Sequence, residues 1–232
     1  MTAENWWYSP QTMLIFADRA LEECRTRDVV PSGESQKAIG EGRTCAIFAL
    51  GLAKAFATET WMRLVHPRER APDVQVMYFD QNGPRGSHRM NVLYVEVATY
   101  TTHSSEALAD FLFRVKLDPT KRAYSDNTVI VVFVQRGTTP EEIRVAHEEL
   151  QGRDIRLLCY LVGRFDDVRF QVAQVMPQFR GAQTINLDEA FASGQMPVAE
   201  VKRGMSSVVT VSEKPISTPN PFIERLQASE RE

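Results

Sequence analysis

Asp73 and Glu96 are the residues whose types and spacing best suit chemistry. Asp73 precedes one apolar, β-branched segment, Glu96 lies within a second, and a Gly/Pro-rich break separates the two. This pattern predicts a two-stranded hairpin. If the hairpin is centred between Pro84 and Arg85, Asp73 lies opposite Glu96, with Cβ atoms about 5 Å apart on one face of the sheet. Two carboxylates at that spacing suit a hard divalent cation with oxygen ligands.

The Pro-Asp dipeptide that ends in Asp73, followed by a hydrophobic strand carrying Glu96, resembles the PD-(D/E)XK nuclease superfamily. The resemblance implies that both acids bind Mg²⁺ and that the reaction is phosphodiester hydrolysis of DNA. That superfamily keeps a lysine two residues after the second acid, where this chain has Ala98. Lys116, on the helix predicted after the second strand, is the first candidate for a displaced lysine, and Lys121 is the second.

Two further groups of residues could contribute to such a site. Glu41 resembles an accessory metal-binding acid that some superfamily members carry, although the spacing favours an exposed helical ion pair with Lys37 as the alternative interpretation. Gln75 would lie on the same face as the acids and would add polar atoms without charge. Several arginines around the hairpin predict a nucleic-acid-binding patch, with a solvated surface as the alternative interpretation: Arg63, Arg68, Arg70, Arg85 and Arg89.

The elements that position these residues follow from the periodicity of apolar side chains. Helices are predicted over 35–58, from 105 and over 139–152, and strands over 127–135 and 155–162. The fold class is therefore α/β, with a mixed central sheet flanked by helices, and the order of elements resembles a restriction endonuclease-like core. Later segments predict a helix over 167–175 and an edge strand over 207–211. The expected organisation is an N-terminal helical extension (1–34), the α/β domain (35–211) and a flexible tail (212–232).

Composition limits the class of protein. A formal net charge of −3 argues against a protein that coats nucleic acid, but it allows a local basic patch. No apolar run is long enough to span a membrane, and the N-terminus lacks the pattern of a signal peptide. Three widely spaced cysteines indicate reduced core thiols. We therefore expect a cytoplasmic protein without a membrane partner.

Three functional hypotheses remain open from the sequence. The first is a nuclease-like protein that binds DNA and hydrolyses it with Mg²⁺. The second is a catalytically inactive relative that keeps the nuclease fold and acts as a binding or assembly module through a protein partner or a homo-oligomer. The third is an unrelated α/β protein in which the two acids are incidental.

Overall fold

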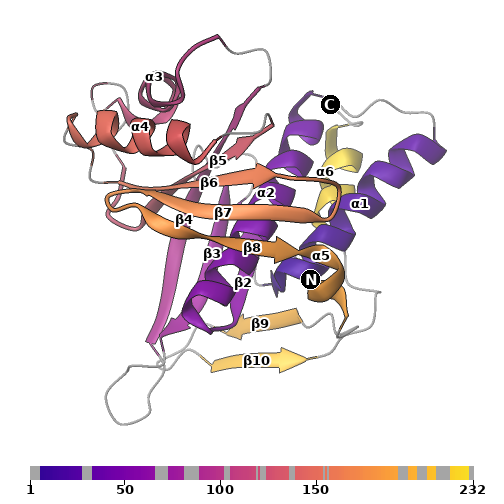
Figure 1. Cartoon of the computed structure of the whole chain (residues 1–232). Coiled ribbons are helices and arrows are strands. Elements are labelled where there is room, and N and C mark those ends of the chain that lie inside the picture. The colour runs from indigo at the N-terminus through magenta and orange to yellow at the C-terminus, as the bar shows by residue number, and fades with distance from the viewer. Residues whose placement is uncertain are drawn as a thin grey trace.

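The computed structural model describes most of the chain. The described residues are 6–27, 33–65, 73–80, 89–101, 105–118, 120, 124–135, 139–153, 155, 157–192, 198–202, 208–212 and 220–229. They form one mixed sheet with helices on both faces (Figure 1). The strands are β1 (Trp6–Tyr8), β2 (Thr60–Leu64), β3 (Val74–Asp80), β4 (Arg89–Tyr100), β5 (Thr128–Val134), β6 (Leu158–Arg164), β7 (Arg169–Met176), β8 (Arg180–Asn186), β9 (Val198–Lys202) and β10 (Val208–Ser212). The helices are α1 (Pro10–Thr26), α2 (Gly33–Phe56), α3 (Leu108–Leu112), the π-helix η3 (Phe113–Leu117), α4 (Pro140–Gln151), α5 (Leu187–Phe191) and α6 (Pro221–Ser229).

The described part of the sheet has the strand order β10-β9-β1-β2-β3-β4-β5-β6-β7-β8. Strands β4, β5 and β6 run parallel to one another, and every other neighbouring pair is antiparallel. Strands β3 and β4 pair from Val74 with Val95 to Asp80 with Arg89. This register confirms the predicted hairpin centre, because both pairs are symmetric about the midpoint between residues 84 and 85.

Strands β5 and β6 confirm the predicted parallel unit at the centre of the fold. They pair from Val129 with Leu158 onwards, and α4 provides the crossover between them. Helix α4 begins with the predicted capping box, in which Thr139 and Glu142 bond each other's main-chain N–H groups. Both strands are apolar on both faces because helices cover both faces at this point.

Two layers of helices enclose the sheet (Figure 1). Helices α1, α2 and α6 cover one face, where they pack on residues such as Val74, Val95 and Val131. Helices α3 and α4 cover the other face over β4 to β7, where they pack on Ala98 and Val132. The alternation of side chains along each strand produces this division.

Several segments differ from the sequence predictions. Residues 169–176 form β7 and not a helix, because the turn at Asp166–Arg169 folds the chain back along β6. The segment 212–232, expected to be a flexible tail, contains helix α6, which packs against α1 and α2. The predicted N-terminal extension also contributes β1 to the sheet.

The predicted edge strand is confirmed, because β10 lies at one end of the described sheet.

The observed class is mixed α/β, as predicted, whereas the restriction endonuclease-like core stays a prediction. The three cysteines are buried free thiols, and burial raises the pKa of Cys159 to about 12, as expected of core residues. Within the described ranges, none of the helices combines the length and apolarity needed to cross a membrane.

Candidate active site

The candidate site lies at the start of strand β3, beside β4. The β3–β4 pairing ends at Val74 and Val95, whereas β4 stays paired with β5 as far as Tyr100. Among the described residues, β4 therefore has no strand partner on its β3 side after Val95. Side chains from both faces of the sheet can approach one another around such an edge.

The Asp73 carboxylate occupies the start of this free edge. Its Oδ2 accepts a hydrogen bond of 2.9 Å from the Val97 N–H, and its own N–H donates to the Val95 carbonyl at 3.1 Å. The carboxylate thus supplies the acceptor that a longer β3 would have provided to β4. These hydrogen bonds fix the position of Asp73. Because the residue is only half-buried, part of it stays accessible.

Glu96 forms a buried ion pair with Lys116. Lys116 Nζ lies 2.6 Å from Glu96 Oε2, and the two residues are 8% and 5% exposed. Lys116 comes from η3, a π-helical segment that continues α3, and π-helical turns are frequent at functional sites. Removing two charges from water costs free energy that a well-packed apolar pair would not require. The pair therefore needs an explanation beyond stability.

Glu41 and Lys37 extend the cluster from helix α2. Lys37 Nζ lies 3.3 Å from Glu41 Oε1, as the sequence spacing predicted. Burial and the Asp73 carboxylate raise the pKa of Glu41 to about 7, against the opposing effect of Lys37 and Lys116. Glu41 in turn raises the pKa of Lys37 despite burial, and Asp73 and Glu96 add to that rise. We define the charged cluster as the five side chains that are joined by these two ion pairs and by their effects on each other's pKa: Lys37, Glu41, Asp73, Glu96 and Lys116.

The charged cluster unites all three acids predicted as metal ligands with the lysine predicted to be displaced. Within the part of the chain that the structure describes, no three His, Cys, Asp or Glu side chains form a preformed metal-binding group. The carboxylates are instead engaged with cations and a main-chain N–H group. Whether Asp73 and Glu96 share one ion stays a prediction.

The predicted basic patch is only partly described. Arg63, on β2, donates through Nε to Gln75 Oε1 at 2.7 Å, and its guanidinium lies 5.0 Å from the centre of the Trp7 ring. Gln75 pairs with Tyr94, two residues before Glu96 and on the same face of β4, so it lies on the predicted face of the sheet. Arg89 is the first residue of β4. The remaining predicted residues lie outside the described ranges: Arg68, Arg70, Arg85 and Lys121.

Sequence reasoning missed Arg225, which helix α6 brings to the same region. Burial lowers the pKa of its guanidinium, and the carboxylates of Glu41 and Asp73 oppose that effect. The sequence does contain a signal for the helix that carries Arg225. Asn220-Pro221 is a typical helix start, and Phe222, Ile223 and Leu226 follow at helical spacing.

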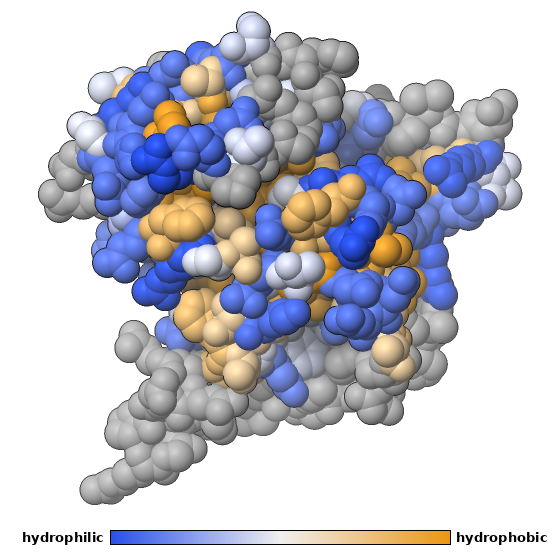
Figure 2. Space-filling model, viewed as in Figure 1, coloured by the Kyte–Doolittle hydropathy of each residue, from blue (hydrophilic) through white to orange (hydrophobic). Residues whose placement is uncertain are grey.

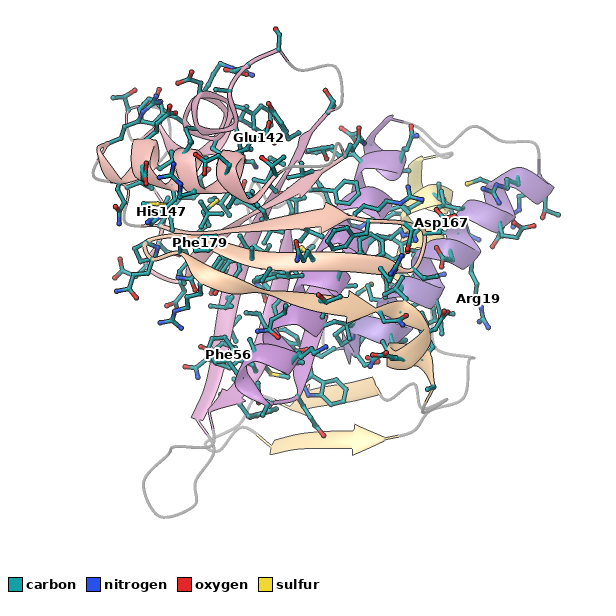
Figure 3. The ribbon with its side chains drawn as sticks, in the orientation of Figure 1. Arg19, Phe56, Glu142, His147, Asp167 and Phe179 are labelled. Carbon is teal, nitrogen blue, oxygen red and sulfur yellow. The ribbon has the colours of Figure 1, made fainter. Side chains whose placement is uncertain are left out.

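A second polar region lies at the opposite end of helix α2. A cavity of about 310 Å³ is lined there mainly by apolar and aromatic side chains, with Tyr160, Gln174 and Arg180 among the polar ones. The Tyr160 hydroxyl donates to Gln174 Oε1 at 3.0 Å, and Gln174 Nε2 donates to the Gln178 carbonyl at 3.1 Å. Phe56, labelled in Figure 3 at the end of α2, contributes an exposed ring. The described residues that line this cavity include no carboxylate.

Surface hydropathy does not single out another site on the face shown in Figure 2, where apolar residues are mixed with hydrophilic ones. No family model, curated protein or solved structure matches this chain. The chemistry of the charged cluster therefore carries the functional argument.

Proposed function

We propose that this protein is a Mg²⁺-dependent nuclease of the PD-(D/E)XK type, which hydrolyses phosphodiester bonds in DNA at the charged cluster. The buried contact between Lys116 Nζ and Glu96 Oε2 carries the proposal. It provides the lysine that Ala98 cannot provide, next to the acid that the motif requires. An unrelated α/β protein would have no reason to bury this pair beside two further carboxylates.

The donor chemistry of the charged cluster suits Mg²⁺, although its carboxylates do not form a preformed metal-binding group among the described residues. Asp73, Glu96 and Glu41 offer hard carboxylate oxygens, which Mg²⁺ prefers and usually supplements with water. Mg²⁺ bound there would lower the pKa of a coordinated water and offset negative charge on the phosphate. The half-buried position of Asp73 leaves an approach for substrate.

The residues of the chain have separate roles in this proposal. The Val97 N–H holds the Asp73 carboxylate in a fixed orientation. Lys116 donates one N–H to Glu96, and its other N–H donors would orient an attacking water and stabilise charge on the phosphate. The raised pKa of Glu41 means that this carboxyl group keeps its proton up to about pH 7, and a cation bound beside it would displace that proton.

A catalytically inactive binding module is the competing function. Ala98 favours it, since the motif position itself carries no cation. The engagement of Glu96 by Lys116 would then be purely structural. The two functions differ in whether the intact cluster cuts DNA.

Cleavage of supercoiled plasmid in Mg²⁺ and in EDTA tests the proposal. The wild-type protein should nick plasmid only with Mg²⁺. Loss of a positioned catalytic group commonly lowers rates about 10²–10⁴-fold, and we expect a loss of this size in Lys116→Ala. Lys121→Ala is the matched control and should keep wild-type activity. Absence of Mg²⁺-dependent cleavage by the wild-type protein, or equal cleavage by Lys116→Ala, would contradict the proposal.

A further inference from the structure

Helix α6 is capped by Asn220 and is fixed to the body of the protein by a hydrogen bond and by apolar packing. Asn220 Nδ2 donates to the Phe16 carbonyl of α1 at 2.8 Å, and Asn220 Oδ1 accepts from the Phe222 N–H at 3.0 Å. The Phe222 ring is 1% exposed and packs directly over Gly42 of α2, where a Cβ atom would overlap it. Gly42 directly follows Glu41, so this docking brings α6 to the part of α2 that carries the charged cluster. Figure 1 shows α6 beside α1 and α2.

Arg225 is the residue that α6 directs towards the cluster. Its Nη2 donates to the Val65 carbonyl, and the Val65 N–H donates to the Asp73 carbonyl at 3.3 Å. The guanidinium is therefore linked through one residue to the main chain of Asp73. The carboxylates of Glu41 and Asp73 both act on its pKa, which burial lowers. A hydrogen-bond chain through Val65 thus links Arg225 to the main chain of Asp73, and the effect of the two acids on its pKa agrees with that placement.

We propose that Arg225 is a substrate-binding residue that contacts a phosphate group of DNA at the charged cluster, an inference that rests on the proposed nuclease function. A guanidinium carries five N–H donors in a rigid planar fork, and the hydrogen bond to Val65 requires only one of them. Arginine stays charged even when burial lowers its pKa, and its planar fork matches phosphate oxygens. The same contact to Val65 orients the fork before substrate arrives.

This role assigns a function to the C-terminal helix. The acids and Lys116 come from α2, from the β3–β4 pair and from η3. The described arginine side chains of α2 and η3 pair with other acids, Arg43 with Asp18 and Arg114 with Glu106. Helix α6 contributes Arg225 from the far end of the chain, more than 100 residues after Lys116 in the sequence. The alternative is that Arg225 only ties α6 to the sheet through Val65.

Binding of a fluorescein-labelled DNA duplex, measured by fluorescence anisotropy over a range of salt concentrations in EDTA, separates these roles. Arg225→Gln should weaken binding about 10–100-fold, the usual effect of one hydrogen bond to a charged group. It should also reduce the slope of log affinity against log salt by about one, because one phosphate contact is lost. Arg225→Lys should restore the slope and part of the affinity, because the charge is kept and the fork is not.

Glu224→Gln is the matched control, because Glu224 is the exposed neighbour of Arg225 on α6. It should not lower duplex affinity or change thermal stability. A purely structural Arg225 would lower the thermal stability of Arg225→Gln without changing the salt slope, and that result would overturn the proposal. Equal affinities of wild type and Arg225→Gln, or no duplex binding by the wild type, would overturn it as well.

The test is separable from the test of the nuclease function. If the wild-type protein binds duplex but does not cut it, the nuclease function fails while the salt slope still decides whether Arg225 contacts phosphate. If the wild-type protein cuts, Arg225→Gln should raise KM about as much as it weakens duplex binding, with a smaller change in kcat.

Discussion

The two ends of helix α2 lie beside two polar regions of different character. Near its N-terminus, the charged cluster contains a buried ion pair, Glu96–Lys116. Near its C-terminus, the cavity contains a neutral hydrogen-bonded pair, Tyr160–Gln174. A neutral pair of this kind satisfies buried polar groups at little cost, whereas a buried ion pair is often no more stable than an apolar replacement. We therefore propose that the charged cluster is retained for chemistry and the neutral pair for packing.

The two pairs also differ in the secondary-structure elements that position their side chains. Tyr160 and Gln174 lie on neighbouring strands, β6 and β7, and pair directly in register. Glu96 comes from strand β4 and Lys116 from a π-helical turn. They meet just beyond the first residue of β3, where the β3–β4 pairing stops. Cross-strand pairing produces the first contact, beside a register shift between Cys159 and Tyr160, whereas the second contact needs a π-helical turn.

Among the substitutions that distinguish the two regions, loss of Lys116 should produce the largest change in the free energy of unfolding. Lys116→Met leaves the Glu96 carboxylate buried without its partner, which should destabilise the fold by about 3–5 kcal/mol. The double variant Glu96→Leu, Lys116→Met removes both charges and should recover most of that loss in urea unfolding. Both variants should lack cleavage activity. A single variant as stable as wild type would show that the pair is not desolvated as the structure indicates.

Asp73→Asn should separate the chemical role of Asp73 from its structural one. The asparagine Oδ1 can still accept the hydrogen bond from Val97, so the change in unfolding free energy should stay below about 1 kcal/mol. Loss of one metal-binding charge should lower the rate of Mg²⁺-dependent plasmid cleavage about 10²-fold or more. Wild-type cleavage in this variant would exclude Asp73 from the site.

Tyr160→Phe tests the neutral region in the same assays. It removes the hydroxyl that donates to Gln174 and should destabilise the fold by about 0.5–1.5 kcal/mol in urea unfolding. Plasmid cleavage should be unchanged when measured well below the melting temperature. A large loss of cleavage by the folded variant would show that the two regions are functionally connected.

The smallest expected effect is a pH dependence of stability due to Glu41. Its pKa is raised from 4.5 to about 7 in the folded protein, so the folded state binds a proton that the unfolded state has released between these values. This contribution to stability is therefore full below the unfolded pKa and is lost as pH rises through about 7. Thermal melts in EDTA should show a smaller decrease in stability over this pH window for Glu41→Gln than for wild type. Identical pH profiles would contradict the assigned pKa.

Local patterns predicted the hairpin register and the parallel β5–α4–β6 unit because each depends on short-range signals. The symmetric Gly/Pro break fixed the pairing of Val74 with Val95, and the capping box at Thr139 marked the start of α4. The same reasoning selected Lys116 and Glu41 as accessory residues, and the structure places both in one cluster with Asp73 and Glu96.

Long-range packing explains what local patterns could not predict. The segment 167–175 is predicted as a helix from the sequence, but residues 169–176 form β7, because the turn onto β6 decides for a strand. Helix α6 depends on the space that Gly42 leaves for Phe222, 180 positions later in the chain. Arg225 could not be placed in the site without that contact.

Calorimetric titration of the purified protein with Mg²⁺ and Mn²⁺ tests the central claim most directly. The charged cluster should bind Mg²⁺ in the millimolar range and Mn²⁺ more tightly, and binding should be lost in both Asp73→Asn and Glu96→Gln. Tyr160→Phe should titrate like the wild type, because the neutral region has no part in metal binding. Absence of a binding signal in the wild type, or binding that survives in Asp73→Asn and Glu96→Gln, would contradict the assignment of the charged cluster as a metal-dependent active site.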